Sequence, residues 1–135
     1  MAEFLFAYGT LRPGMAPPDV APLVDRMQPA GEAFVSGVLY DFGHFPGAVL
    51  DRNSGSRIYG TVFRLPEEGG LLPLIDAYEE FQPDCPEASL FLRVTGAAFL
   101  SGGESLTCWI YVYNRQIGPA PIIEDGRWPQ RRSPE

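Results

Sequence analysis

The chain is poor in the residue types from which metal sites and nucleophilic sites are most often built. Its 135 residues include one histidine, His44, and two cysteines, Cys85 and Cys108. A single histidine excludes most zinc sites and most serine–histidine pairs. The cysteines form no Cys-x-x-Cys pair. We expect two ordinary thiols in a reducing cytoplasm, and a disulfide between them is the alternative.

Positive charge and long apolar runs are also scarce. Ten lysine or arginine residues stand against 17 aspartate or glutamate residues, which gives a net charge of −7. This balance argues against a nucleic-acid partner, because phosphate binding needs a basic surface. No apolar run is long enough to span a bilayer, and the N-terminus lacks the pattern of a signal peptide. We expect a cytoplasmic protein that binds a small molecule and no membrane, and the sequence leaves its oligomeric state open.

What the chain does have is many turn residues, 14 prolines and 15 glycines, between short apolar segments. Its length suits one domain, which we place at residues 1–128, with 129–135 as a flexible tail. Alternation and apolar runs predict strands at 3–8, 33–40, 48–50, 58–65, 90–100 and 106–114. The last strand is apolar on both faces, which is typical of a central strand. We predict an α+β fold: a mixed, strongly curled, barrel-like sheet of five to six strands with two or three short helices.

Two helices are predicted, over 19–27 and 72–81. In the first, Asp19 would cap the N-terminus. In the second, Pro73 suits the first turn.

In the predicted strand at 33–40, Phe34, Val38 and Tyr40 share one face.

The second helix contains an acidic residue on its apolar side. At about 100° per residue, an apolar stripe forms, made of Leu72, Leu74, Ile75, Tyr78 and Phe81. Glu79 falls inside this stripe, whereas Glu80 points to the opposite side. Asp76 lies between the two faces, and we expect it to be exposed or to act as a cap.

A carboxylate that faces the interior is costly unless it is paired or its pKa rises. Glu79 is therefore a candidate general acid/base, because desolvation moves the pKa of a glutamate towards neutrality. In the alternative, Glu79 lies at the edge of the stripe and pairs with an arginine, Arg93 or Arg57.

The segment Tyr8-Gly9-Thr10-Leu11 follows the first strand and presents successive backbone N–H groups with little obstruction. Glycine can adopt a positive φ, and such a turn can hold a carboxylate or an oxyanion. A tight turn without a ligand is the alternative. Arg12 either strengthens anion binding or lies in solvent. Tyr111, on the aromatic face of the last strand, belongs either to the core or to a pocket wall.

A series of segments, in order along nearly the whole chain, resembles the γ-glutamylcyclotransferase-like family, with its γ-glutamylamine cyclotransferase and AIG2-like branches. The similar segments are FAYGTLRPG (6–14), VSGVLYDFGHFPGAV (35–49), YGTVF (59–63), IDAYE (75–79), Arg93-Val94, WIYVYN (109–114) and IEDGRW (123–128). The family's acid/base glutamate aligns with Glu79. Glu80 stands where the family usually has glycine, and Phe91 stands where it has tyrosine.

The resemblance implies an enzyme that cleaves a γ-glutamyl amide. The substrate's α-amine would attack its own γ-carbonyl, giving 5-oxoproline and a free amine, with Glu79 as general acid/base. Tyr8, Gly9, Thr10, Leu11, Arg12 and Tyr111 would bind the substrate. The chemistry implied needs no metal and no organic cofactor. The alternative is a non-catalytic module of the same fold that binds a small anion.

Overall fold

A computed structural model describes residues 3–67 and 70–129 of the chain. In chain order its elements are β1 (Phe4–Ala7), α1 (Ala21–Val24), β2 (Gln28–Asp41), β3 (Pro46–Leu50), β4 (Arg57–Arg64), α2 (Leu71–Tyr78), the 3₁₀ turn η1 (Pro86–Ala88), β5 (Phe91–Leu100) and β6 (Ser105–Tyr113). Apart from Pro129, the tail expected at 129–135 lies outside the described residues.

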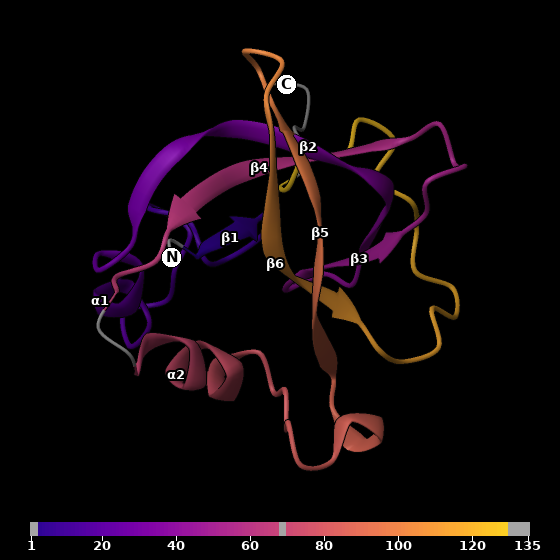
Figure 1. Cartoon of the computed structure of the whole chain (residues 1–135). Coiled ribbons are helices and arrows are strands. Elements are labelled where there is room, and N and C mark those ends of the chain that lie inside the picture. The colour runs from indigo at the N-terminus through magenta and orange to yellow at the C-terminus, as the bar shows by residue number, and fades with distance from the viewer. Residues whose placement is uncertain (1–2, 68–69, 130–135) are drawn as a thin grey trace, which may run out of the picture.

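The strands form one curled sheet in the order β3-β2-β4-β1-β6-β5, and β2 also pairs with β5. This extra pairing joins Ala33 to Leu100 and Phe34 to Phe99. It closes five strands into a barrel, and β3 extends the sheet beyond it (Figure 1). All neighbouring strands are antiparallel except β1 and β6, which run parallel. The predicted α+β fold with a mixed, barrel-like sheet is confirmed.

Two hydrophobic cores lie on the two faces of the central strands β1 and β6. Along β1, Leu5 and Ala7 belong to the core that also contains the helix residues Val24 and Ile75. Phe6, on the opposite face, belongs to the core of β2, β4 and β6 residues. Side chains alternate across a strand, so each of these strands is covered on both sides. The prediction of a central strand at 106–114 is therefore confirmed.

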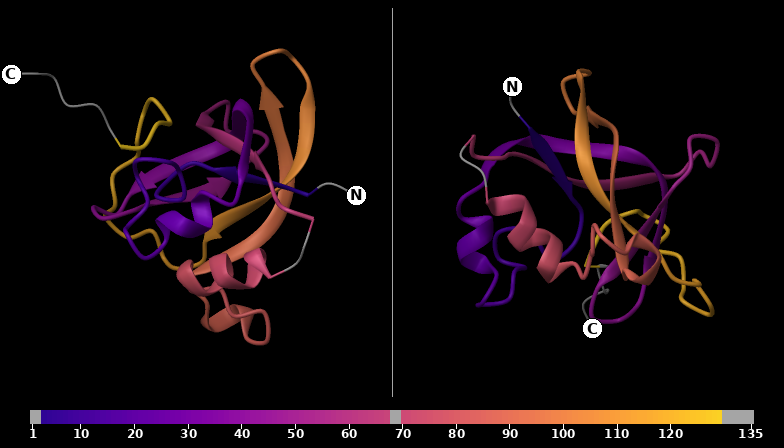
Figure 2. Two further views of the ribbon diagram at one scale, coloured as in Figure 1. Left: turned by 90° about the vertical axis from the view of Figure 1, so that its left-hand side faces the viewer. Right: turned by 60° about the horizontal axis from the view of Figure 1, so that its bottom comes forward.

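The two helices lie next to each other at one end of the barrel (Figures 1 and 2). Helix α1 is shorter than the predicted 19–27 and begins at Ala21. Its N-cap residue is Val20, no side chain caps it, and Asp19 is exposed. The predicted Asp19 cap is wrong. The first turn instead carries a proline, whose fixed φ suits the start of a helix.

Strand β2 is longer than predicted. It starts at Gln28, five residues before the predicted start at Ala33. The early part carries an irregularity between Pro29 and Gly31, where the pairing with β4 shifts register. The side chains of Ala33, Val35 and Leu39 are buried. The face formed by Phe34, Val38 and Tyr40 is only half-buried and is the outer one.

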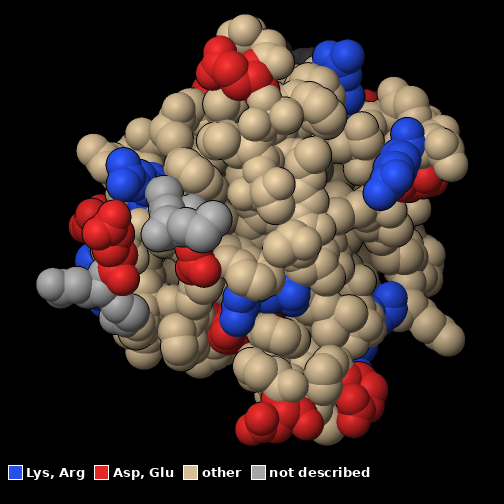
Figure 3. All heavy atoms as spheres, in the orientation of Figure 1, with Lys and Arg blue, Asp and Glu red and all other residues tan. Residues whose placement is uncertain are grey.

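The face that shows β5 and β6 is largely uncharged, with acidic and basic side chains mostly around its border (Figure 3).

Cys85 and Cys108 are both free thiols, as expected. Within the described ranges, no helix combines the length and the hydropathy needed to cross a bilayer.

Candidate active site

A pocket opens where the end of β1, the loop after it, the start of β3 and the end of α2 meet. The space between its lining atoms, open solvent at the mouth included, is about 360 Å³, and the part in which the centre of a water molecule fits is about 30 Å³. It is lined by Phe6, Ala7, Tyr8, Gly9, Thr10, Leu11, Phe45, Pro46, Glu79, Phe91 and Tyr111. The fold therefore brings together six of the predicted site residues: Tyr8, Gly9, Thr10, Leu11, Glu79 and Tyr111.

The loop from Gly9 to Leu11 lines this pocket, and its main-chain N–H groups are free of hydrogen bonds within the described part of the chain. Among the described residues, no hydrogen bond of the protein has the N–H group of Gly9, Thr10 or Leu11 as its donor. Most buried or half-buried N–H groups in proteins are paired, so three unpaired ones beside a pocket are ready to bind an acceptor.

Gly9 is not one of the glycines with positive φ. A glycine is needed at this position because another part of the chain approaches its Cα atom closely. A Cβ atom at this position would lie 2.9 Å from Cγ of Pro46. The close contact sets the loop against the first residue of β3. The positive φ that the sequence suggested for Gly9 is not adopted.

Helix α2 ends beside this loop. Its last residue, Tyr78, shares a hydrogen bond of 2.6 Å between its hydroxyl oxygen and Oγ1 of Thr10. Glu79 follows as the C-cap, and its N–H group still donates to the carbonyl of Ile75 at 2.9 Å. The backbone thus continues the helical path by one residue, and Glu79 lines the pocket.

The carboxyl group of Glu79 is held in surroundings that disfavour its charge. Burial, with the charge of Glu80 as the second cause, raises the pKa of Glu79 from 4.5 to about 8. Within the described part of the chain, the ion pairs are Arg64–Glu67 and Asp76–Arg93, so Glu79 has no cationic partner. The alternative that Glu79 pairs with Arg93 or Arg57 is therefore wrong. Glu80 is exposed, as predicted.

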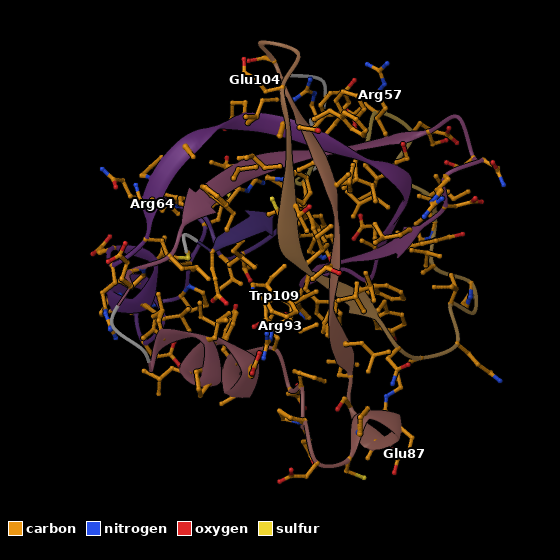
Figure 4. All side chains as sticks on the ribbon, in the orientation of Figure 1. Arg57, Arg64, Glu87, Arg93, Glu104 and Trp109 are labelled. Carbon is orange, nitrogen blue, oxygen red and sulfur yellow. The ribbon has the colours of Figure 1, made fainter. Side chains whose placement is uncertain are left out.

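The arginine Arg93 pairs instead with Asp76, one helical turn before Glu79. Nε of Arg93 donates to Oδ1 of Asp76 at 2.8 Å, and Nη2 donates to Oδ2 at 3.2 Å. The guanidinium also lies over the ring of Trp109, 4.3 Å from the ring centroid (Figure 4). Asp76 is only 4% exposed, which corrects the expectation of an exposed or capping residue. The charge of Asp76 can be buried because Arg93 binds its carboxylate through two hydrogen bonds and the hydroxyl of Tyr111 donates a third.

The two pocket tyrosines have their hydroxyl groups engaged inside the protein. The hydroxyl of Tyr8 donates to the carbonyl of Tyr111 at 2.5 Å and accepts the N–H group of Ala48 at 3.2 Å. The hydroxyl of Tyr111 donates to Oδ1 of Asp76 at 2.6 Å. Burial, with the charge of Glu79 as a further cause, raises the pKa of both phenols well above the ordinary value. Both rings are therefore neutral walls of the pocket.

Arg12 does not line the pocket. Its Nε donates to the carbonyl of Gly9 at 3.1 Å, and its Nη2 donates to the carbonyl of Trp128. The side chain therefore ties the loop to the C-terminal segment. The sequence did not point to Phe45 and Pro46 as pocket residues, because their contact with the first strand depends on how β3 packs in three dimensions.

The site combines one carboxyl group of raised pKa with a row of unpaired N–H donors in a half-closed pocket. The carboxyl group can accept or donate a proton near neutral pH, and the donors can bind a carboxylate or a developing oxyanion. The fold and this site define a class of small α+β barrels with an acidic residue beside the loop after the first strand. Residues 5–130 match the family described as γ-glutamyl cyclotransferase, AIG2-like. The chain belongs to this family.

Relatives agree with this membership. A γ-glutamylcyclotransferase family protein, ytfP of Citrobacter rodentium (strain ICC168), is 29% identical over 96 residues, which are 69% of this chain and 68% of the relative. A structure of an AIG2-like protein from Mus musculus superposes with a TM-score of 0.70 at 21% identity, covering 91% of this chain and 86% of the other. YkqA from Bacillus subtilis gives a TM-score of 0.68 at 24% identity over 95% of this chain, which spans only 40% of YkqA. These two structures share the fold.

Proposed function

We propose that the pocket binds the γ-glutamyl part of an amide and cyclises it to 5-oxoproline, with release of the free amine. The observation that carries the proposal is the placement of Glu79, which has no cationic partner among the described residues, in one pocket with the unpaired N–H groups of Gly9, Thr10 and Leu11. The reaction needs one group that moves a proton and one set of donors for a negative oxygen. The pocket has one of each.

In this mechanism the substrate supplies its own nucleophile. The α-amine nitrogen forms a bond to the γ-carbonyl carbon, and the amide bond between that carbon and the leaving nitrogen breaks. Glu79 accepts a proton from the amine and passes one to the departing nitrogen. The products sum to the substrate, so no water is consumed. Because the attack is intramolecular, holding the γ-glutamyl chain in a folded shape lowers the barrier most.

The pKa of Glu79 suits both halves of this proton transfer. At a pKa of about 8, the carboxyl group exchanges protons near neutral pH. An ordinary glutamate with a pKa of about 4.3 would be a weaker base towards the substrate's amine.

The loop after β1 would position the substrate. The N–H groups of Gly9, Thr10 and Leu11 would hold the α-carboxylate or the developing oxyanion. The rings of Tyr8 and Tyr111 would confine the glutamyl chain, since their hydroxyl groups are already engaged. Arg12 would stabilise the loop through the carbonyl of Gly9 rather than touch the substrate.

The test compares two adjacent acidic residues. Glu79→Gln keeps the shape of the side chain but removes the proton acceptor, so 5-oxoproline release should fall at least about 100-fold. Glu80→Gln, at an exposed position, should change the rate only mildly. The measurement is 5-oxoproline formed from γ-glutamyl amides by each purified protein. Equal losses in the two variants would contradict the role of Glu79, and ligand binding without turnover by the unaltered protein would favour the small-anion-binding module.

A second substitution tests the loop. In Gly9→Ala the new Cβ atom would lie 2.9 Å from Cγ of Pro46, so the loop or Pro46 must shift. We expect a higher KM with a folded protein, because the substitution moves the N–H donors away from the substrate. An unchanged KM would contradict the role of the loop.

A further inference from the structure

Aromatic rings form the side of the pocket that carries neither the acid nor the N–H donors. Phe45 and Phe91 line the pocket, and their rings meet edge to face with centroids 5.8 Å apart. Phe42 and Tyr113 lie behind them, stacked with centroids 4.1 Å apart. Phe42 also stacks on Phe45 at 5.6 Å, and Tyr113 meets Phe91 edge to face at 5.7 Å. We call these four side chains the aromatic wall.

The backbone holds this wall in place. Phe91 opens β5 and pairs in register with Tyr113, which ends β6. On the other side, a Cβ atom at Gly47 would lie 2.5 Å from a ring atom of Phe42 and 3.0 Å from Cβ of Tyr113. The segment that carries Phe42 and Phe45 is thus packed tightly onto β6. Ring pairs with this edge-to-face and stacked geometry stabilise one another, so the wall keeps its shape when a ligand arrives.

The aromatic wall has no positive charge that could bind a carboxylate on the leaving group. Among the pocket-lining residues that the structure describes, Glu79 is the one with a carboxyl group, and none is a lysine or an arginine. The arginines in the neighbouring segments are engaged elsewhere, Arg12 with two carbonyl groups and Arg93 with Asp76. The unpaired N–H groups of the loop are required for the γ-glutamyl part itself. A carboxylate on the leaving group would therefore lose its hydration without gaining a partner.

We propose that the amine released by this protein is apolar, carries no carboxylate, and is best recognised when it bears an aromatic ring. Such a ring can rest against Phe45 and Phe91 in the same edge-to-face manner in which these two meet. Amino acids and dipeptides are poor leaving groups at this site. This inference rests on the proposed function and identifies the substrate class for it.

Three synthetic amides separate the effects of the ring and of the carboxylate. γ-Glutamyl-phenethylamide and γ-glutamylphenylalanine differ only by the carboxylate on the leaving group, and γ-glutamyl-ethylamide lacks the ring. We expect kcat/KM for the phenethylamide to exceed the value for the phenylalanine compound at least about tenfold, because of the unpaired charge. It should exceed that of the ethylamide about tenfold as well, because the ring is buried against the wall.

A matched pair of variants assigns the preference to the wall. Phe45→Leu removes a pocket ring, whereas Phe99→Leu removes a phenylalanine that is 39% exposed on β5 and lies outside the pocket. Phe45→Leu should reduce the ratio of kcat/KM for phenethylamide over ethylamide at least about threefold, the loss expected for one ring contact. Phe99→Leu should leave this ratio as it is.

The outcomes separate this inference from the function on which it rests. Equal or faster turnover of γ-glutamylphenylalanine would overturn the substrate class and leave the cyclotransferase proposal standing. A preference for the phenethylamide that Phe45→Leu does not change would overturn the role of the wall. If none of the three amides yields 5-oxoproline, the proposed function fails, and this inference fails with it.

Discussion

The hydroxyl group of Tyr111 donates a hydrogen bond of 2.6 Å to Oδ1 of Asp76, the same oxygen that accepts Nε of Arg93. Through this carboxylate, helix α2 is joined to β6 and to β5 at once. The junction lies one helical turn before Glu79, so it fixes the end of the helix from which the candidate acid/base extends. Residues on three elements thus hold the pocket together.

This junction predicts a large loss of stability in Asp76→Asn. The substitution leaves the guanidinium of Arg93, largely buried against Trp109, without its counter-charge, so the free energy of unfolding should fall by about 3 kcal/mol. Tyr111→Phe removes only a hydrogen bond to a charged group and should cost about 1.5 kcal/mol. Urea unfolding at pH 7 measures both.

The exposed ion pair Arg64–Glu67 is the control for this prediction. The two side chains are 50% and 75% exposed and lie 3.7 Å apart. Glu67→Gln should therefore change the free energy of unfolding by less than about 0.5 kcal/mol. If Asp76→Asn costs no more than Glu67→Gln, the buried junction does not hold the helix as argued.

The raised pKa of Glu79 predicts that its removal stabilises the protein in alkaline solution. The pKa is 4.5 in the unfolded chain and about 8 in the folded protein. Since the folded state holds the proton more tightly, stability is full below pH 4.5 and is lost as the pH rises to about 8. Glu79→Gln cannot ionise, so it should be more stable than the unaltered protein at pH 9, by roughly 1.4 kcal/mol for each unit of pKa difference.

Thermal unfolding at pH 5 and at pH 9 checks this sign. The two proteins should unfold at similar temperatures at pH 5 and separate at pH 9, with the Gln variant higher. The activity of the unaltered protein should rise with pH through about 8, because the proposed mechanism needs the carboxylate form. A Gln variant that is less stable at pH 9 would show that Glu79 is not held in a desolvated position.

The backbone at Glu80 predicts that glycine is the better residue there. Among the described residues, Glu80 is the one non-glycine residue with a positive φ, 56°. This strain explains why glycine at this place would suit the turn after α2. Glu80→Gly should raise the free energy of unfolding by about 1 kcal/mol over Glu80→Gln, because only glycine relieves the left-handed conformation.

Both substitutions remove the charge that helps to raise the pKa of Glu79. The midpoint of the pH–activity curve should therefore move to lower pH by the same amount in Glu80→Gly and Glu80→Gln. Measured together, urea unfolding and the pH–activity curve separate strain from charge. If the Gly and Gln variants are equally stable, the positive φ carries no cost.

Local patterns in the sequence were sufficient for most of the fold and for the side of α2 on which Glu79 lies. The helix ends at Tyr78, yet extrapolating its 100° step to Glu79 gave the correct side, because the N–H group of Glu79 still bonds to Ile75 as in a helix. Strand β6 was recognised as a central strand because both of its faces are apolar, and β1 was recognised as a short apolar run.

Features that depend on distant partners could not be predicted in the same way. Asp76 looked like a surface residue, since its partners Arg93 and Tyr111 come from strands later in the chain. The first part of β2 has the sequence Gln-Pro-Ala-Gly-Glu, which has little strand preference, and it is extended because β4 pairs with it.

The C-terminal segment contains a glycine that allows two backbones to meet. Gly126 has φ +68°, its carbonyl accepts the N–H group of Tyr59 at 2.8 Å, and a Cβ atom there would lie 1.9 Å from the carbonyl oxygen of Arg57. This contact fastens the segment to β4 and keeps Ile123, 2% exposed, in the core. We predict that Gly126→Ala is strongly destabilising.

Gly118→Ala is the matched control, because Gly118 has a similar φ of +62° but nothing within 4 Å of a Cβ atom. Both variants have alanine in the left-handed region, which costs about 1 kcal/mol. Gly126→Ala must in addition separate two backbone segments, so it should cost about 3 kcal/mol or more. Because the same backbone penalty is present in both, their difference in urea unfolding measures the close approach alone. Equal costs would mean that the segment can move away from β4 without loss, and that Ile123 does not depend on Gly126 for its place in the core.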